Sequence, residues 1–149
     1  MAAAALLAGW SSDRLIRAGH SPSRVRKSYA TAGLLLCGAA MFPAPMVDSA
    51  SHSLALITLA CGAISLFSAN VWAITQTLAG PPAAGRWTGF QNFIGNLGGV
   101  AAPLITGWIV SETGSFLFAF WTAAAILIMG VAAYAVLLKN IEPVSWQTT

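Results

Sequence analysis

The chain has 149 residues, of which 57% are hydrophobic and 7% are charged, and its formal net charge is +3. Soluble globular domains carry about 25% charged residues, so this composition excludes a soluble domain and indicates an integral membrane protein. The seven Lys and Arg residues stand between apolar runs without interleaved aromatic residues, which excludes nucleic acid as a partner.

The chain starts with an apolar segment that is too short to cross a bilayer, because a spanning helix needs about 20 residues. This segment also lacks the basic region that begins a signal peptide. We expect residues 1–8 to be the last part of a helix whose beginning is missing. A cytoplasmic loop is expected over 9–28, and it holds Asp13, Arg14 and Arg17.

Four later segments are uncharged and long enough to span a hydrocarbon core of about 30 Å. They show no alternation of apolar and polar residues, so they are predicted to be helices and not barrel strands. The predicted fold is therefore all-α and integral to the membrane, with four full transmembrane helices and a partial N-terminal helix in a single domain over 1–149. The predicted spans are 29–47, 53–79, 88–110 and 115–138, followed by a cytoplasmic tail over 139–149.

The charged residues predict the orientation of these helices. In an alternating topology, all seven Lys and Arg residues fall on one side of the membrane. Cytoplasmic loops carry the excess of Lys and Arg, so residues 9–28, the loop over 80–87 and the C-terminus are predicted to be cytoplasmic. The short turns over 48–52 and 111–114 then face outward. The sequence of the C-terminal tail indicates no role for it.

The predicted spans contain no Asp, Glu, Lys or Arg, so this chain lacks the intramembrane ionisable group of a proton relay. Cys37 and Cys61 do not have the spacing of a metal site and are interpreted as small packing residues. Gly95 and Gly99 have the spacing that lets two helices approach closely. We expect no metal, no cofactor and no enzymatic activity.

Neutral polar residues lie on one face of each of the two middle spans. At about 100° per residue, the face around Trp72 includes Ser65, Ser68 and Gln76, and the face around Asn92 includes Thr88, Asn96, Gly99 and Pro103. Gln91 lies at the edge of the second face. Asn70 points the other way and is expected to form a hydrogen bond between helices. These residues either tie helices together, at about 0.6 kcal/mol each, or line a polar substrate cavity.

The expected cytoplasmic loop has the pattern Gly9-x-x-x-Asp13-Arg14-x-x-Arg17. It resembles the loop signature of the major facilitator superfamily, which occurs between helices 2 and 3 and, in weaker form, between helices 8 and 9. Since four spans follow, the resemblance implies the C-terminal part of such a transporter, from the end of helix 8 through helix 12. In this cytoplasmic gate motif, Gly9 would let another helix pass closely. Asp13 would lie against a helix N-terminus or a basic residue.

A second stretch, "TLAGPPAAGRWTGFQNFIGN", is similar to the helix 10–11 region of the anion:cation symporter family. Sugar-acid transporters of that family contact substrate through a tryptophan and an asparagine. The matching residues are Trp72 and Asn92, with Gln91 as a further contributor. The resemblance implies part of a proton-coupled symporter of sugar acids or related small organic anions, working by alternating access in a bacterial inner membrane.

The resemblance also implies partners. These are a small organic anion, a proton, the lipid bilayer, and the missing N-terminal half or another membrane partner. Because the family's coupling carboxylates lie in that other half, we expect no coupled transport from this chain alone. The alternative is a small membrane protein without transport activity of its own, which acts only through helix–helix assembly with partners.

Overall fold

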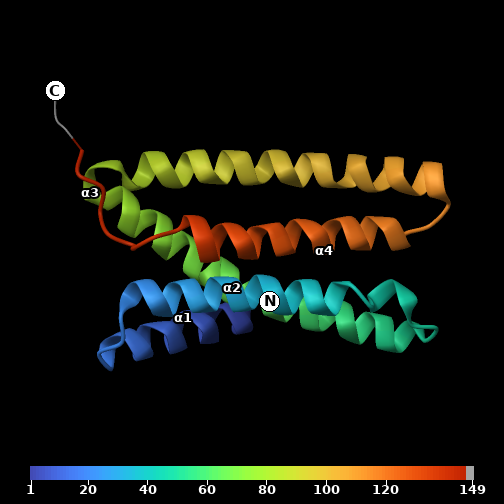
Figure 1. The fold of residues 1–149 in the computed structure, drawn as a ribbon, viewed down its shortest axis with the longest axis horizontal. Coiled ribbons are helices and arrows are strands. Elements are labelled where there is room, and N and C mark those ends of the chain that lie inside the picture. The colour runs from blue at the N-terminus through green and yellow to red at the C-terminus, as the bar shows by residue number, and fades with distance from the viewer. Residues whose placement is uncertain (147–149) are drawn as a thin grey trace.

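A computed structural model describes residues 1–146, and the last part of the predicted tail, 147–149, lies outside the described residues. The described residues are helical or irregular and contain no strand, which confirms the all-α class (Figure 1). The elements in chain order are α1 (Ala2–Arg17), α2 (Pro22–Met41), the 3₁₀ turn η1 (Ala44–Met46), α3 (Ala50–Thr113), α4 (Leu117–Ala132) and the π-helical turn η2 (Ala133–Leu137).

The longest helix, α3, is divided by a sharp elbow. Gly80 has φ 65° and ψ 171°, a backbone conformation that is essentially restricted to glycine. The elbow separates a first arm, residues 50–79, from a second arm, residues 81–113, which runs back across the molecule (Figure 1). Each arm is longer than the about 20 residues that a membrane span needs. Pro22–Met46, which joins α2 and η1, and Leu117–Leu137, which joins α4 and η2, are also long and apolar enough to span a membrane. With the two arms of α3, residues 1–146 thus contain four membrane-length segments.

Two segments expected to be loops are largely helical. The expected loop over 9–28 is reduced to residues 18–21, because α1 continues to Arg17 and α2 already begins at Pro22. The expected loop over 80–87 is reduced to the elbow itself. In both places a helix begins at a proline, which is suited to the first turn of a helix because the N–H groups there have no helical acceptor. Pro81 and Pro82 accordingly begin the second arm.

Packing is concentrated around α2, which contacts both the first arm of α3 and α4. One core cluster joins Cys37 and Ala40 of α2 to Ala60 and Ala63 of the first arm. These small residues let the backbones of α2 and the first arm approach each other closely. Among the glycines, Gly33 lies closest to a neighbouring helix, since a Cβ atom there would lie 2.6 Å from the backbone nitrogen of Phe67.

The predicted close approach at Gly95 and Gly99 is not found, since nothing in the described chain lies within 4 Å of a Cβ built at either residue. Both lie on the second arm, which is exposed along most of its length. The second arm runs beside α4, to which the turn at Gly114 connects it (Figure 1).

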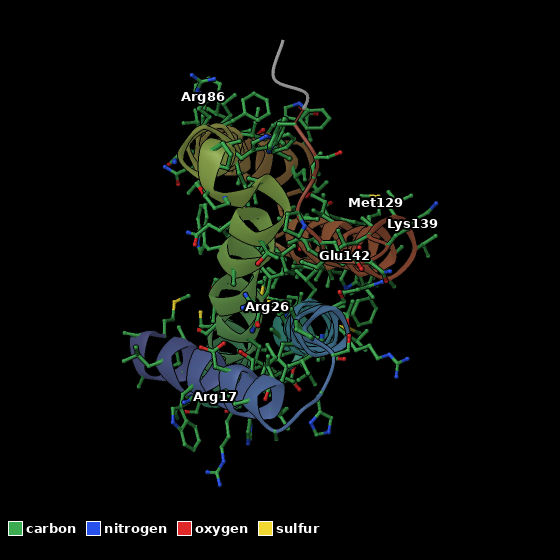
Figure 2. The ribbon with its side chains drawn as sticks, turned by 90° about the vertical axis from the view of Figure 1, so that its left-hand side faces the viewer. Arg17, Arg26, Arg86, Met129, Lys139 and Glu142 are labelled. Atoms are coloured by element: carbon green, nitrogen blue, oxygen red, sulfur yellow. The ribbon has the colours of Figure 1, made fainter. Side chains whose placement is uncertain are left out.

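The directions of the helices bring the basic residues to one end of the molecule. The end of α1, the start of α2, the elbow and the end of α4 all lie at that end, while the turns near Asp48 and Glu112 lie at the other (Figure 1). Figure 2 looks onto the basic end and shows Arg17, Arg26, Arg86 and Lys139 spread across it. We refer to it as the basic end. Its placement on the cytoplasmic side of a membrane remains a prediction from the charge pattern.

Candidate functional site

A cavity of about 400 Å³ lies inside the elbow of α3. The first arm, the second arm and the C-terminal segment each provide one wall. Its lining residues are Thr75, Leu78 and Ala79 from the first arm, Trp87, Phe90, Gln91 and Ile94 from the second arm, and Val144 and Trp146 from the C-terminal segment. The walls are mainly apolar and aromatic, and besides the indole N–H groups of the two tryptophans their polar side-chain groups are the hydroxyl of Thr75 and the amide of Gln91.

These two polar groups bond to each other across the cavity. The Thr75 hydroxyl donates a hydrogen bond to Oε1 of Gln91, and thereby ties the two arms together. Gln91 was predicted as a possible substrate contact, and the structure places it in the cavity wall. The role of Thr75 was missed. The spacing of Trp87, Phe90, Gln91 and Ile94 is i, i+3, i+4, i+7, so the sequence did contain the signal for this face of the second arm.

Trp72 and Asn92 lie outside the walls of this cavity. Trp72 is 36% exposed, and Asn92 is exposed on the second arm. At a rise of 1.5 Å per residue, Trp72 lies about 12 Å and Asn92 about 18 Å along their arms from Gly80. If the basic end marks one membrane surface, both residues lie near the middle of a hydrocarbon core of about 30 Å. In that placement Trp72 and Asn92 lie at a similar depth in the membrane, but they do not line one common cavity in the described structure.

The neighbouring polar residues mostly bond within their own helix. Asn70 is 1% exposed, and its amide donates to the carbonyl of Leu66 in the preceding turn. The expectation that Asn70 bonds between helices is therefore wrong in the described chain. Asn96 likewise donates to the backbone carbonyl of Asn92 at 2.7 Å. Ser65 is buried where the chain start crosses α3, and its hydroxyl is 3.3 Å from the carbonyl oxygen of Met1.

The cytoplasmic gate motif lies on the last turns of α1. Gly9 is inside the helix, not at its end, and nothing in the described chain lies within 4 Å of a Cβ built there, so the expected close helix approach is absent from this part of the structure. Asp13 is exposed, and its backbone carbonyl accepts a hydrogen bond from Nε of Arg17 at 3.4 Å. The guanidinium of Arg14 lies over the ring of Trp10, at 5.3 Å from its centroid.

Residues with metal-binding side chains are scattered. Among residues 1–146, no group of three or more His, Cys, Asp or Glu side chains is placed to hold a metal ion. Cys37 is buried in the core between α2 and the first arm, as a small packing residue would be.

Four membrane-length helical segments, whose few charged residues lie near their ends and whose basic residues gather at one end of the molecule, define a multi-pass membrane protein. Comparison with known families identifies its kind: the model for the "Major Facilitator Superfamily" matches residues 1–149. The chain belongs to the major facilitator superfamily, a family of transporters and not of enzymes.

Individual relatives carry names of anion and sugar-acid transporters. A D-galactonate transporter of Escherichia coli O6:H1 is 30% identical over 143 residues, covering 93% of this chain and 32% of the relative. A probable galactarate/D-glucarate transporter of Bacillus subtilis is 32% identical, covering 95% and 31%. A probable chloroplastic anion transporter of Arabidopsis thaliana is 32% identical, covering 97% and 28%. The chain spans about a third of the length of these relatives.

Proposed function

We propose that this chain forms part of the C-terminal half of a proton-coupled symporter for sugar acids or related small organic anions. The observation that carries the proposal is the family match over the whole chain, together with relatives named as galactonate and galactarate/glucarate transporters. The transporter works by alternating access, with substrate bound between two halves that rock about it. It lies in a bacterial inner membrane, with the basic end and the C-terminus in the cytoplasm.

In this proposal Trp72 and Asn92 contact the substrate near the middle of the membrane. Substrate sites of such carriers lie near the bilayer midplane, and the depth of both residues supports this assignment. Their exposure in the described chain leaves the indole and the amide free to meet a ligand or the other half of the carrier. An indole N–H and an amide can both hydrogen-bond the hydroxyls and the carboxylate of a sugar acid. Gln91, which accepts a hydrogen bond from Thr75, contributes to substrate binding from the edge of the polar face around Asn92.

The gate motif at Gly9, Asp13, Arg14 and Arg17 would serve the cytoplasmic side. Its charged side chains are exposed at the basic end, where the other half of a carrier would come into reach when the cytoplasmic side closes. Asp13 with its basic neighbours would form a latch at that contact. No acidic or basic residue occurs within either arm of α3 between Leu54 and Gly80 or between Trp87 and Ser111. Proton coupling would therefore depend on residues outside this chain.

The site assignment is tested in a chimera in which this chain replaces the matching region of the D-galactonate transporter. In proteoliposomes with an imposed proton gradient, the chimera is expected to accumulate labelled sugar acid, and a protonophore is expected to abolish accumulation. Asn92→Ala leaves polar groups of the substrate unpaired, at a cost of about 1–3 kcal/mol, so uptake should fall between about fivefold and a hundredfold. Trp72→Ala should have an effect of the same order.

Two matched variants control this experiment. Thr58→Ala removes an exposed hydroxyl that bonds its own helix on the first arm, and Trp108→Ala removes an exposed indole from the far end of the second arm. Both should keep uptake within about twofold of the parent chimera. Equal uptake by the Asn92, Trp72 and control variants would refute the assignment. Gradient-driven uptake by the 149-residue chain alone would refute the proposal that it forms only one wall of the carrier.

A further inference from the structure

The elbow of α3 leaves backbone groups in need of partners. In an α-helix the carbonyl of each residue accepts from the N–H four residues later. The carbonyl of Leu78 would pair with residue 82, but Pro82 has no N–H to donate. Leu78 is half-buried, and an unpaired carbonyl is costly in an apolar environment. A donor from outside the helix is therefore required at this place.

The C-terminal segment supplies that donor. The backbone N–H of Val144 donates to the carbonyl of Leu78 at 2.9 Å. Two residues further on, Nε1 of the Trp146 indole donates to the carbonyl of Ala79 at 2.7 Å. Both hydrogen bonds reach the end of the first arm, immediately before Gly80.

The same segment also contacts the second arm. The ring of Trp146 packs against that of Trp87, with 6.2 Å between the centroids. Trp87 lies seven residues beyond Gly80, on the other side of the elbow. Trp146 thus bonds one arm through its N–H and packs against the other through its ring.

The segment is fixed at its other end to α2. The backbone N–H of Ile141 donates to Oγ of Ser23 at 2.9 Å, and Nζ of Lys27 donates to the carbonyl of Leu138. Ile141 is 5% exposed and packs in a cluster with Ala30 and with Ile74 of the first arm. The segment therefore runs from the start of α2 to the elbow, held at both ends.

We propose that residues 138–146 form a strap that sets the angle between the two arms of α3. The second arm has few other contacts, since its residues from Asn92 to Val100 are all exposed. Its position depends on the strap, on the Thr75–Gln91 hydrogen bond and on the turn to α4. Releasing the strap would let the second arm swing about Gly80 and carry Asn92 with it. The strap is a conformational lock at the basic end of the molecule, and this inference does not depend on which substrate is carried.

The lock is tested by measuring the distance between the arms of the full chain in lipid nanodiscs. Spin labels are attached to Thr58→Cys and Val100→Cys, which are exposed positions on the two arms, after Cys37 and Cys61 are replaced by alanine. Val144→Pro removes the N–H that bonds Leu78, and Val144→Ala keeps it. Losing one such hydrogen bond changes an equilibrium by about fivefold. The population with the arms further apart should rise by about that factor in Val144→Pro and stay unchanged in Val144→Ala.

Trp146 provides a second, independent pair of variants. Trp146→Ala removes both the N–H and the ring, so it should widen the distance distribution at least as much as Val144→Pro. Trp146→Phe keeps a ring against Trp87 and should have a smaller effect. A reference pair of labels at Leu36→Cys and Thr58→Cys, on α2 and the first arm, should not change. Distributions that match Val144→Ala in both Val144→Pro and Trp146→Ala would overturn the proposal, and so would an equal change in the reference pair.

Discussion

Replacing Gly33 with alanine is expected to lower the free energy of unfolding by about 2–3 kcal/mol. A Cβ at this position would lie 2.6 Å from the backbone nitrogen of Phe67 and 2.9 Å from the carbonyl oxygen of Ala63. These crowded atoms belong to the backbone of α3 and cannot move away by a rotamer change, as a side chain can. Helix α2 and the first arm must therefore separate. The core around Cys37 would then lose its packing. Unfolding by a denaturing detergent in mixed micelles measures the effect.

Gly95→Ala makes the same chemical change where there is open space. Nothing in the described chain lies within 4 Å of a Cβ at Gly95, and alanine favours a helix over glycine by up to about 1 kcal/mol. This variant should be as stable as the parent or slightly more stable. If the two variants lost the same stability, the close crossing of α2 and α3 would not be what holds the bundle together.

Replacing Gly80 with alanine is expected to cost about 1–3 kcal/mol through the backbone alone. Its φ of 65° with ψ of 171° is a combination that a residue with a Cβ rarely adopts. A Cβ there would meet only Pro82 and Pro143, at ordinary contact distances of 3.8 and 3.9 Å, so crowding does not add to the cost. The strain would be relieved by changing the elbow, and this would weaken the hydrogen bond from Trp146 to Ala79.

Gly85→Ala is the control for Gly80→Ala, because Gly85 is exposed and helical on the second arm. Detergent unfolding reports stability. In a background in which Trp10, Trp72, Trp108 and Trp121 are replaced by phenylalanine, the fluorescence of Trp87 and Trp146 reports the elbow. Gly80→Ala should lower the stability and change the tryptophan emission, whereas Gly85→Ala should leave the emission unchanged and the stability equal or slightly higher. A Gly80→Ala variant with parental stability and emission would show that the elbow does not need glycine.

The fold class and the number of spans could be predicted because they follow from solvation. A long apolar run without a charged residue, such as Ser53–Ala79, is stable mainly in a bilayer. Inside a bilayer, a run without alternating polar residues can satisfy its backbone hydrogen bonds only as a helix. A break between the second and third spans was predicted as a loop over 80–87 around Arg86, but its form as a sharp elbow at Gly80 was not. Two prolines beside a glycine favour a loop, yet the same prolines are suited to the first turn of a new helix.

The site was less predictable because it depends on contacts between distant residues. Helical spacing places Gln91 at the edge of a polar face but cannot show that Thr75 bonds to it. The C-terminal tail is short and polar, and its sequence indicates no role. In the structure, the N–H groups of this tail donate to the carbonyls of Leu78 and Ala79. These carbonyls need outside donors because the helix bends at Gly80, and the bend was not predicted. The assignments of Trp72 and Asn92 depend on resemblance and stay predictions.

The central claim is that the uncharged helices cross a membrane in alternation, with the basic end in the cytoplasm. The most direct test is labelling of single cysteines in intact cells with a membrane-impermeant maleimide, using a parent chain without Cys37 and Cys61. Ser111→Cys should react from outside, and Gly85→Cys should react only after the cells are permeabilised. Reaction of both positions from the same side of the membrane would contradict this account.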